Sequence, residues 1–300
     1  MSKTIQVLKY KWLWFGLSAV LIIPGIIFMS VYGVKVGIDF KSGTSIEYTA
    51  KSAVTADAVK QAVSKIDLKN LSVTTTGNNG FILKTDALSD EQHSQITDAI
   101  NKSIPDTVEK SYTSVGPTIG KDQTNKAVWR VIIASLAIIL YIAWAFRKVP
   151  KPANSWRFGI CAVVALLHDL IFVIGMFAIL GRYYDFVELD SLTVTALLTI
   201  MGFSVHDTIV VFDRIRENLR LTPGGNFEHV ANVSISQTLA RSLNTSLTVL
   251  IVLLALFLLG GESTKGFVLA LLIGITVGTY SSIFNATPLL VVWQNRSQKH

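Results

Sequence analysis

Long apolar runs alternate with polar segments along this chain, and the alternation predicts a membrane protein. Six runs are almost free of charged residues, at positions 12–34, 131–146, 158–181, 191–212, 242–261 and 266–295. A helix needs about 20 predominantly apolar residues to cross the hydrocarbon core of a bilayer. The second run is shorter, but residues 127–129 extend it, and the long side chain of Arg130 can reach the interface. The pattern therefore predicts six membrane-spanning helices.

The polar segment between the first two runs has the pattern of a small α+β domain. In chain order it predicts a strand, a helix, two strands, a helix and a strand, at positions 38–49, 53–66, 71–75, 80–84, 89–103 and 107–113. Thr55 and Ser89 stand at expected helix starts, and the sequence GNNG at 77–80 predicts a hairpin turn. This order of elements, βαββαβ, is that of a ferredoxin-like domain.

These patterns predict both the fold class and the division of the chain. We expect a membrane all-α bundle of six helices that carries a small extracytoplasmic α+β domain of ferredoxin-like order. Residues 1–34 would hold a cytoplasmic N-terminus and the first span, and residues 35–125 the external domain. Residues 126–300 would hold the other five spans and a cytoplasmic C-terminus.

The distribution of basic residues predicts the orientation of the spans. Half of the residues are hydrophobic, 16% are charged, and the formal net charge is +7. Basic residues gather before the first run and after the second, fourth and sixth, as Lys3, Lys9, Lys11, Arg147, Lys148, Lys151, Arg157, Arg214, Arg216, Arg220, Arg296 and Lys299. The two short loops after the third and fifth runs, which lie on the other side of the membrane in this arrangement, contain only Arg182 and Lys265 as basic residues. Because cytoplasmic loops carry the excess of Lys and Arg, both termini are expected in the cytoplasm, and the charge gives no reason to expect nucleic acid as a partner.

An acidic residue at hydrocarbon depth is the strongest sign of function in the sequence. The fourth run ends in SVHDTIVVFDRIRE, residues 204–217, which places His206 and Asp207 inside the apolar region. Asp213 follows six residues later, about 9 Å along a helix, where the interface is expected. A charge inside a bilayer is costly and usually marks an ion path or a paired network. Asp207 is the main functional candidate, although it could also be a static partner of His206 or Arg241.

Other polar residues at helical spacing accompany Asp207. The fifth run opens with a polar stripe formed by Arg241, Asn244, Thr245 and Thr248. Arg241 lies near the cytoplasmic end of this run, so its side chain could instead simply extend to the interface. The third run contains Asp169 next to His168, and the histidine could satisfy the acid locally.

The sixth run has a face of small residues that favours close packing against another helix. Gly274 and Gly278 form a GxxxG pair, and Asn285 continues the same face. The pair is weak support on its own, because glycine is common in membrane helices.

The residue types exclude most enzymatic chemistry. Asp169 and Asp207 could formally pair as a protease dyad, but the flanking sequence is unlike that of an aspartyl membrane protease. The chain has no HExxH zinc motif and no phosphate-binding glycine loop, so we expect no enzyme activity, no metal and no cofactor. The role that remains for a buried acid is reversible protonation. Moving an arginine toward or away from a buried aspartate changes the proton affinity of the acid, and this couples proton passage to helix motion.

Three segments resemble one protein family over nearly the whole chain. GIDFKSGT at 37–44, the segment at 204–217 and QTLARSLNTSLT at 237–248 are similar to motifs of the SecF family, from the bacterial SecD–SecF export complex of the resistance-nodulation-division superfamily. Ser42 stands where the first motif usually has glycine. The resemblance implies a proton path at Asp207 and Arg241, to which we add the neighbouring polar residues His206, Asp169, Asn244, Thr245 and Thr248. It also marks Gly37, Asp39 and Gly43 as the external-domain motif.

The resemblance further implies a function and a set of partners. The protein would use the proton motive force, or sodium, to drive late steps of preprotein export in a bacterial inner membrane. Its partners would be a SecD-like chain that supplies the missing half, the Sec translocon channel, the preprotein and the lipid bilayer. Two alternatives stay open: a small-molecule exporter of the same superfamily, which would need larger external domains, and an assembly factor that moves no ion.

Overall fold

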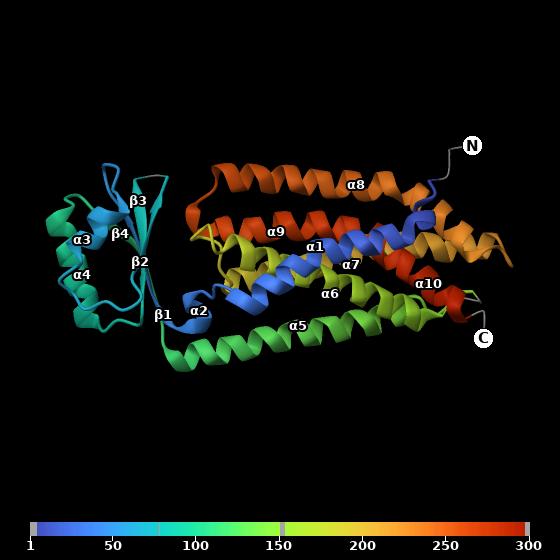
Figure 1. The fold of residues 1–300 in the computed structure, drawn as a ribbon, viewed down its shortest axis with the longest axis horizontal. Helices are drawn as coiled ribbons and strands as arrows, with labels where there is room; N and C mark the ends of the chain where they lie inside the picture. Colours follow the sequence, from blue (N-terminus) through green and yellow to red (C-terminus); the bar gives the residue numbers. More distant parts are fainter. Residues whose placement is uncertain (1–4, 78, 151–153, 298–300) are drawn as a thin grey trace.

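The computed structural model describes residues 5–77, 79–150 and 154–297. A small α/β domain lies at one end of a long helical bundle, and the first and last described helical elements lie at the other end (Figure 1). Three of the basic residues used to orient the chain, Lys3, Lys151 and Lys299, lie outside the described residues, as does Asn78 of the hairpin turn.

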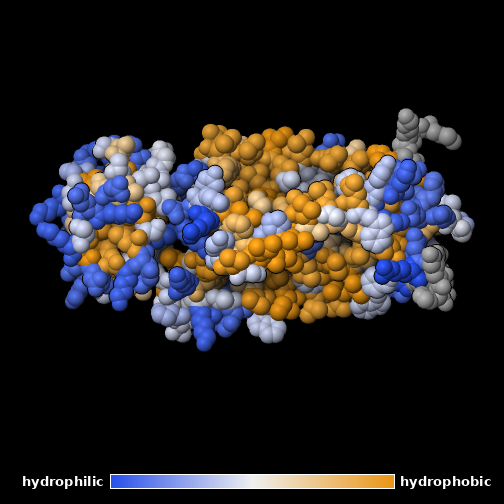
Figure 2. Space-filling view, in the orientation of Figure 1, coloured by the Kyte–Doolittle hydropathy of each residue, from blue (hydrophilic) through white to orange (hydrophobic). Residues whose placement is uncertain are grey.

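In the described part of the chain, six helices are long and apolar enough to cross a membrane, which confirms the predicted number of candidate spans. They are α1 (Lys11–Tyr32), α5 (Pro117–Ala145), α6 (Ser155–Leu180), α7 (Ser191–Leu221), α8 (Phe227–Leu259) and the last span. The last span consists of α9 (Glu262–Ser281), the π-helical turn η2 (Ser282–Ala286) and α10 (Thr287–Ser297). Hydrophobic residues dominate the surface of the bundle, and hydrophilic residues gather at its ends and over the external domain (Figure 2).

The spans form a buried centre and an outer layer. In α6, α7 and the last span, half or more of the apolar stretch is buried inside the protein, at 50%, 56% and 56%. In the spans of α1, α5 and α8 the buried share is only 11%, 6% and 17%. Figure 1 shows α5 and α8 along opposite edges of the bundle. A short 3₁₀ helix, η1 (Val7–Tyr10), joins α1 to α8, because the Leu8 amide donates to Oδ1 of Asn232 at 3.1 Å. Because α6, α7 and the last span are largely buried, their polar residues must find partners on neighbouring helices.

The external domain is a four-stranded antiparallel sheet with two helices. Its elements are β1 (Gly43–Thr49), α3 (Ala56–Ala62), β2 (Ser72–Thr76), β3 (Gly80–Thr85), α4 (Asp90–Ser103) and β4 (Val108–Val115). The strand order is β2-β3-β1-β4, and every neighbouring pair is antiparallel. As expected, Thr55 caps α3, and Ser89 forms a capping box with Gln92 at the start of α4. Burial raises the pKa of Tyr48, in the core between sheet and helices, to about 12.

Two boundaries of this domain differ from those predicted. Residues 38–41 were expected to begin the first strand, but they form one helical turn, α2 (Ile38–Lys41), in which the Lys41 amide donates to the Gly37 carbonyl at 3.1 Å. The turn lies against the first residues of α5, which leaves no room for a side chain at Gly120. The helix α5 itself begins at Pro117, a residue type favoured in a first helical turn, so the expected division at residues 125 and 126 falls inside it.

Ser42 has a backbone conformation that suits glycine. It ends α2 with φ 68° and ψ 155°, a region that is almost restricted to glycine because a Cβ atom clashes with the backbone there. The next residue, Gly43, has φ 146°, and a Cβ on it would lie 2.7 Å from the Thr85 carbonyl oxygen. The motif at 37–44 thus contains a sharp reversal at residues 42 and 43, and the strain lies at Ser42, which is not glycine.

We expect Ser42→Gly to stabilise the protein by about 1 kcal/mol, because it removes the strain of a non-glycine residue in this region. Thermal unfolding of the purified protein in detergent measures the effect. The matched control is Ser45→Gly in β1, which is paired regularly with Lys84 and Thr113 and where glycine should cost about 0.5–1 kcal/mol. A lower unfolding temperature for Ser42→Gly would contradict this account of the turn.

Candidate functional site

Asp207 lies buried in α7 and has few hydrogen-bond partners. It is 5% exposed, and Ser246 of α8 donates to its Oδ2 atom over a long 3.4 Å. The Ser246 hydroxyl in turn lies 2.6 Å from the hydroxyl of Thr279 on α9. The ring of His206 comes within 4.0 Å of Oδ1 but is itself 67% exposed on the outer face of α7. A carboxylate can accept about four hydrogen bonds, so this acid is poorly satisfied.

Arg241 is not paired with Asp207 in this structure, although the sequence placed the two on neighbouring spans at comparable depth. Among the described residues no ion pair joins the two side chains. Arg241 and Asn244 lie on the exposed face of α8, together with Thr245 and Thr248. The hydroxyls of both threonines donate to carbonyls of their own helix, at 2.9 and 2.8 Å. The whole predicted stripe therefore faces away from the bundle.

A different stripe of α8 faces inward. Its members are small hydroxyl residues spaced four apart, all buried: Ser234, Thr238, Ser242 and Ser246. Residues spaced by four lie on one face of a helix, so this face is the one that meets Asp207. The hydroxyl of Ser242 has no partner among the described atoms.

The outer face of α7 is also polar, from its first turns to the depth of Asp207. Thr195, Thr199, Gly202 and His206 are all exposed there. The two threonine hydroxyls donate to carbonyls of their own helix at 2.9 Å each, which leaves His206 as the side chain without such a bond. Lipid hydrocarbon offers no hydrogen-bond partner to an exposed histidine or arginine, so we expect these faces of α7 and α8 to contact another protein surface.

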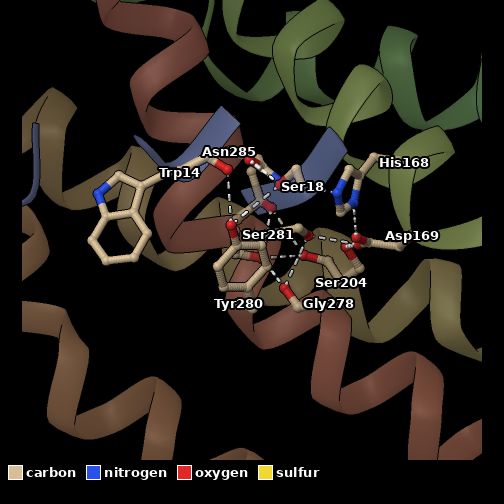
Figure 3. Close-up of polar contacts among 11 residues, drawn as sticks. Trp14, Ser18, His168, Asp169, Ser204, Gly278, Tyr280, Ser281 and Asn285 are labelled. Atoms are coloured by element: carbon tan, nitrogen blue, oxygen red, sulfur yellow. Dashed lines mark hydrogen bonds and ion pairs between the residues drawn. The ribbon is translucent and has the colours of Figure 1, made fainter. Parts of the chain in front are cut away.

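Asp169 on α6 is surrounded by hydrogen-bond donors, in contrast to Asp207. It is fully buried, and its Oδ2 atom accepts from Ser204 of α7 at 2.6 Å and from Ser281 of α9 at 2.7 Å. Its Oδ1 atom lies 2.9 Å from Nδ1 of the adjacent His168 (Figure 3). The carboxylate therefore joins the three central helices at one point.

The network extends from His168 to the first span. Nε2 of His168 lies 3.1 Å from Nδ2 of Asn285, and Oδ1 of Asn285 accepts from Ser18 of α1 at 2.9 Å (Figure 3). The Tyr280 hydroxyl, 3.2 Å from that of Ser18, donates to the Trp14 carbonyl at 3.1 Å. A neutral His168 that donates through Nδ1 and accepts at Nε2 satisfies every contact of its ring. Asn285 belongs to the π-helical turn η2, a form often found at functional sites.

The glycines of the last span set the distance between α9 and α7. A Cβ at Gly274 would lie 2.2 Å from Cδ1 of Ile200, and one at Gly278 would lie 3.2 Å from Cβ of Ser204. This close approach places Ser281, one turn beyond Gly278, within reach of Asp169. The predicted packing face thus lies against α7 of the same chain.

Sequence reasoning missed the hydroxyl residues that contact the two acids. Ser204 and Ser281 bind Asp169, and Ser246 and Thr279 lie beside Asp207. The four-residue spacing on α8 was a usable signal for Ser246, but nothing in the sequence pairs Ser204 with Ser281. No group of three or more His, Cys, Asp or Glu side chains in the described part of the chain could hold a metal ion.

The external-domain motif lies apart from both acids. Asp39 and Gly37 contact the segment that precedes α7 and the first residue of that helix. Gly43 lies in the reversal between α2 and β1. The structure therefore places the motif at the N-terminal end of α7, the helix that carries Asp207.

Six apolar spans, buried acids and a small external domain define a multi-pass membrane protein, and the comparisons with known proteins identify its class as export translocase subunits. The family profile described as "Protein export membrane protein SecD/SecF, C-terminal" matches residues 95–296. The protein translocase subunit SecF of Thermobaculum terrenum is 42% identical over 97% of this chain and 95% of its own length. That of Anaerolinea thermophila is 42% identical over 97% and 94%. This chain belongs to the SecF family.

Longer relatives contain the same fold as one part. The crystal structure of SecDF, a translocon-associated membrane protein from Thermus thermophilus, superposes with a TM-score of 0.85 at 33% identity. The superposition covers 98% of this chain and 39% of that one. A second SecDF structure, in a super-membrane-facing form, gives a TM-score of 0.71 at 31% identity, covering 100% and 40%. The chain thus spans about two fifths of the SecDF proteins that it matches.

We expect Gly274→Ala to destabilise the protein by about 2 kcal/mol, because the new methyl group would overlap the Ile200 side chain in a packed interface. Thermal unfolding in detergent measures the loss. Adding Ile200→Ala should recover part of it by making room. Gly16→Ala is the matched control, since a Cβ at Gly16 would meet nothing within 4 Å, and it should cause no loss. An unchanged unfolding temperature for Gly274→Ala would contradict the close packing.

Proposed function

We propose that this protein is an auxiliary subunit of the Sec translocase, and that it works with a SecD-like partner to couple the proton gradient to late steps of preprotein export. The observation that carries the proposal is the state of Asp207: a buried acid with one long hydrogen bond, next to two helix faces whose polar side chains point out of the chain. The relatives named as protein translocase subunits support the export role.

The outward polar faces support a partner inside the membrane. Arg241 and Asn244 on α8 and His206 on α7 are exposed in this chain, and each would be costly against lipid. In SecDF of Thermus thermophilus the region matched by this chain is joined to a much longer one in the same polypeptide, since the match covers 36% of that protein. A separate SecD-like chain would cover the polar faces here and complete the bundle.

The separation of Asp207 and Arg241 supports a two-state mechanism. With the arginine turned away, no Lys or Arg among the described residues pairs with the buried carboxyl, and the exposed His206 ring lies 4.0 Å from it. Rotation or sliding of α8 that brought Arg241 inward would favour the charged acid, and the reverse movement would favour its protonation. A charge moved across 100 mV supplies about 2.3 kcal/mol, enough to bias a two-state arrangement of helices. Sodium could take the place of the proton.

We assign the titrating role to Asp207 and a positioning role to Asp169. The three donors around Asp169 satisfy an ionised carboxylate, and adding a proton to it would disturb its contacts with α7 and α9 together. This narrows the proton path expected from the sequence to Asp207, His206 and the outward stripe of α8.

The fold of the external domain supports a ferredoxin-like assignment. The order β2-β3-β1-β4, with antiparallel neighbours and the two crossover helices α3 and α4, is the arrangement that a βαββαβ unit gives. Such a domain, with four strands and two helices of its own, is small for a binding site that encloses a drug-sized molecule. This favours export of protein over the small-molecule exporter alternative.

Asp207→Asn should abolish gradient-dependent preprotein export while the complex still assembles. The amide keeps the size and hydrogen-bonding reach of the acid but cannot titrate. Arg241→Met should act likewise, because it removes the charge that alternates with the proton. Export into membrane vesicles, with and without an imposed gradient, measures the effect.

The matched control for this experiment is Asp213→Asn on the same helix. Asp213 is half exposed and paired with Arg216 at 2.5 Å, so its neutralisation should leave export near the wild-type level. Normal export by an assembled Asp207→Asn complex would overturn the coupling role and leave the assembly-factor alternative.

The orientation is open to direct labelling. With both termini cytoplasmic, a cysteine at Thr76 in the external domain should react with an impermeant maleimide added to intact cells. Cysteines at Asn154 and Asn226, which cap α6 and α8 at the opposite end of the bundle, should react only after the membrane is opened. Labelling of Asn154→Cys in intact cells would reverse the proposed topology.

A further inference from the structure

The segment that leaves α1 is paired with the segment that leads into α7. The Gly37 amide donates to the Leu189 carbonyl at 2.7 Å, and the Leu189 amide donates to the Lys35 carbonyl at 2.8 Å. These two bonds form an isolated parallel bridge centred on Val36 and Leu189. The first residues of the external domain are therefore fixed to the start of α7.

Asp39 extends this connection to the helix itself. Its Oδ2 atom accepts a hydrogen bond of 2.8 Å from the amide of Ser191, the first residue of α7. The helix has its own cap, Asp190, whose Oδ1 atom accepts from the Thr193 amide at 2.7 Å. The first four amides of a helix lack partners within it and carry the positive end of its dipole, so a second carboxylate is favourable there. Asp39 supplies it from another part of the chain.

The contact of α2 with the starts of α7 and α5, which we call the joint, is closely packed. A Cβ at Gly37 would lie 3.0 Å from Cβ of Asp190, and one at Gly120 of α5 would lie 3.0 Å from the Phe40 carbonyl oxygen. The turn α2 is thus held between the start of α7 and the first turns of α5. Movement of α7 along its axis would push on α2 directly.

Elsewhere the external domain touches the bundle lightly. A cavity of about 240 Å³ lies between the polar face of the sheet and the loops around α7 and α9, lined by residues such as Glu47, Thr74 and Phe186. Lys84 of β3 crosses this space to form an ion pair with Glu188. The bridge, the Asp39 cap and this ion pair therefore carry most of the connection between the sheet and α7.

We infer that Asp39 is a positioning residue through which movement of α7 reaches the external domain. Asp207 and Ser191 lie on one uninterrupted helix, 16 residues or about 24 Å apart along the axis. The path runs from Asp207 along α7 to Ser191, across to Asp39, and through α2 into β1. The idea that Asp207 drives the movement of α7 rests on the proposed function, but the contacts that join the external domain to α7 do not.

The test measures how firmly the external domain is held. Spin labels replace Ser94, exposed on α4, and Tyr183, exposed after α6, in the full chain with its co-purifying subunits in liposomes and with Cys161→Ala as background. Pulsed electron paramagnetic resonance then gives the distribution of distances between the labels. Asp39→Asn, whose amide oxygen still accepts from Ser191, should keep the wild-type distribution. Asp39→Ala should broaden or shift it.

A second variant removes the same bond from its other side. Ser191→Pro deletes the amide hydrogen at the first helical position, where proline is well tolerated, and the extended backbone of Asp190 suits a following proline. It should broaden the distribution as Asp39→Ala does, and the double variant should go no further than either one. Distributions like wild type in both single variants would overturn the inference.

Measuring preprotein export by the variants tests this inference separately from the proposed function. Asp39→Ala should lose export while Asp39→Asn keeps it. Normal export by Asp39→Ala with a broadened distribution would overturn Asp39 as the coupling residue, whatever Asp207 does. Normal export by Asp207→Asn would overturn the proposed function, and the distance measurements would still decide whether the joint exists.

Discussion

Polar groups inside a bilayer must be paired within protein, because hydrocarbon offers them no partner, and this constraint shapes the bundle. Its main expression is the fully buried Asp169 carboxylate, which accepts from Ser204 and Ser281 and lies against His168. These contacts come from α6, α7 and α9, the three central helices. The glycine contacts that bring α9 onto α7 support this arrangement, since a wider spacing would take Ser281 out of reach of the acid.

The same constraint explains why Asp207 stands out. It lies on the same helix as Ser204, one turn further along, yet it has a single long hydrogen bond where Asp169 has three contacts. A buried acid with so little hydrogen bonding is costly, which favours a role in which its partner changes. In the proposed mechanism that change occurs at the outward faces of α7 and α8, the surface that a second membrane subunit would cover.

The sequence predicted the parts whose signals are local. The six spans follow from runs of about 20 apolar residues, and the caps at Thr55 and Ser89 follow from residue type and position. What it could not predict depends on how helices are turned and spaced. Both stripes of α8 satisfy helical periodicity, so the pattern alone could not show that Ser246 faces inward and Arg241 outward. The turn at 38–41 forms through tertiary contacts with α5 and α7, which override a strand-like sequence.

The central claim is that Asp207 takes up and releases a proton within the membrane. Infrared difference spectra of the purified complex in lipid, recorded as the pH is changed, report protonated carboxylic acids directly through their C=O stretch. We predict a band that appears and disappears with pH in the wild type and in Asp213→Asn, and that is missing in Asp207→Asn. Identical pH-dependent spectra for the wild type and Asp207→Asn would contradict the claim.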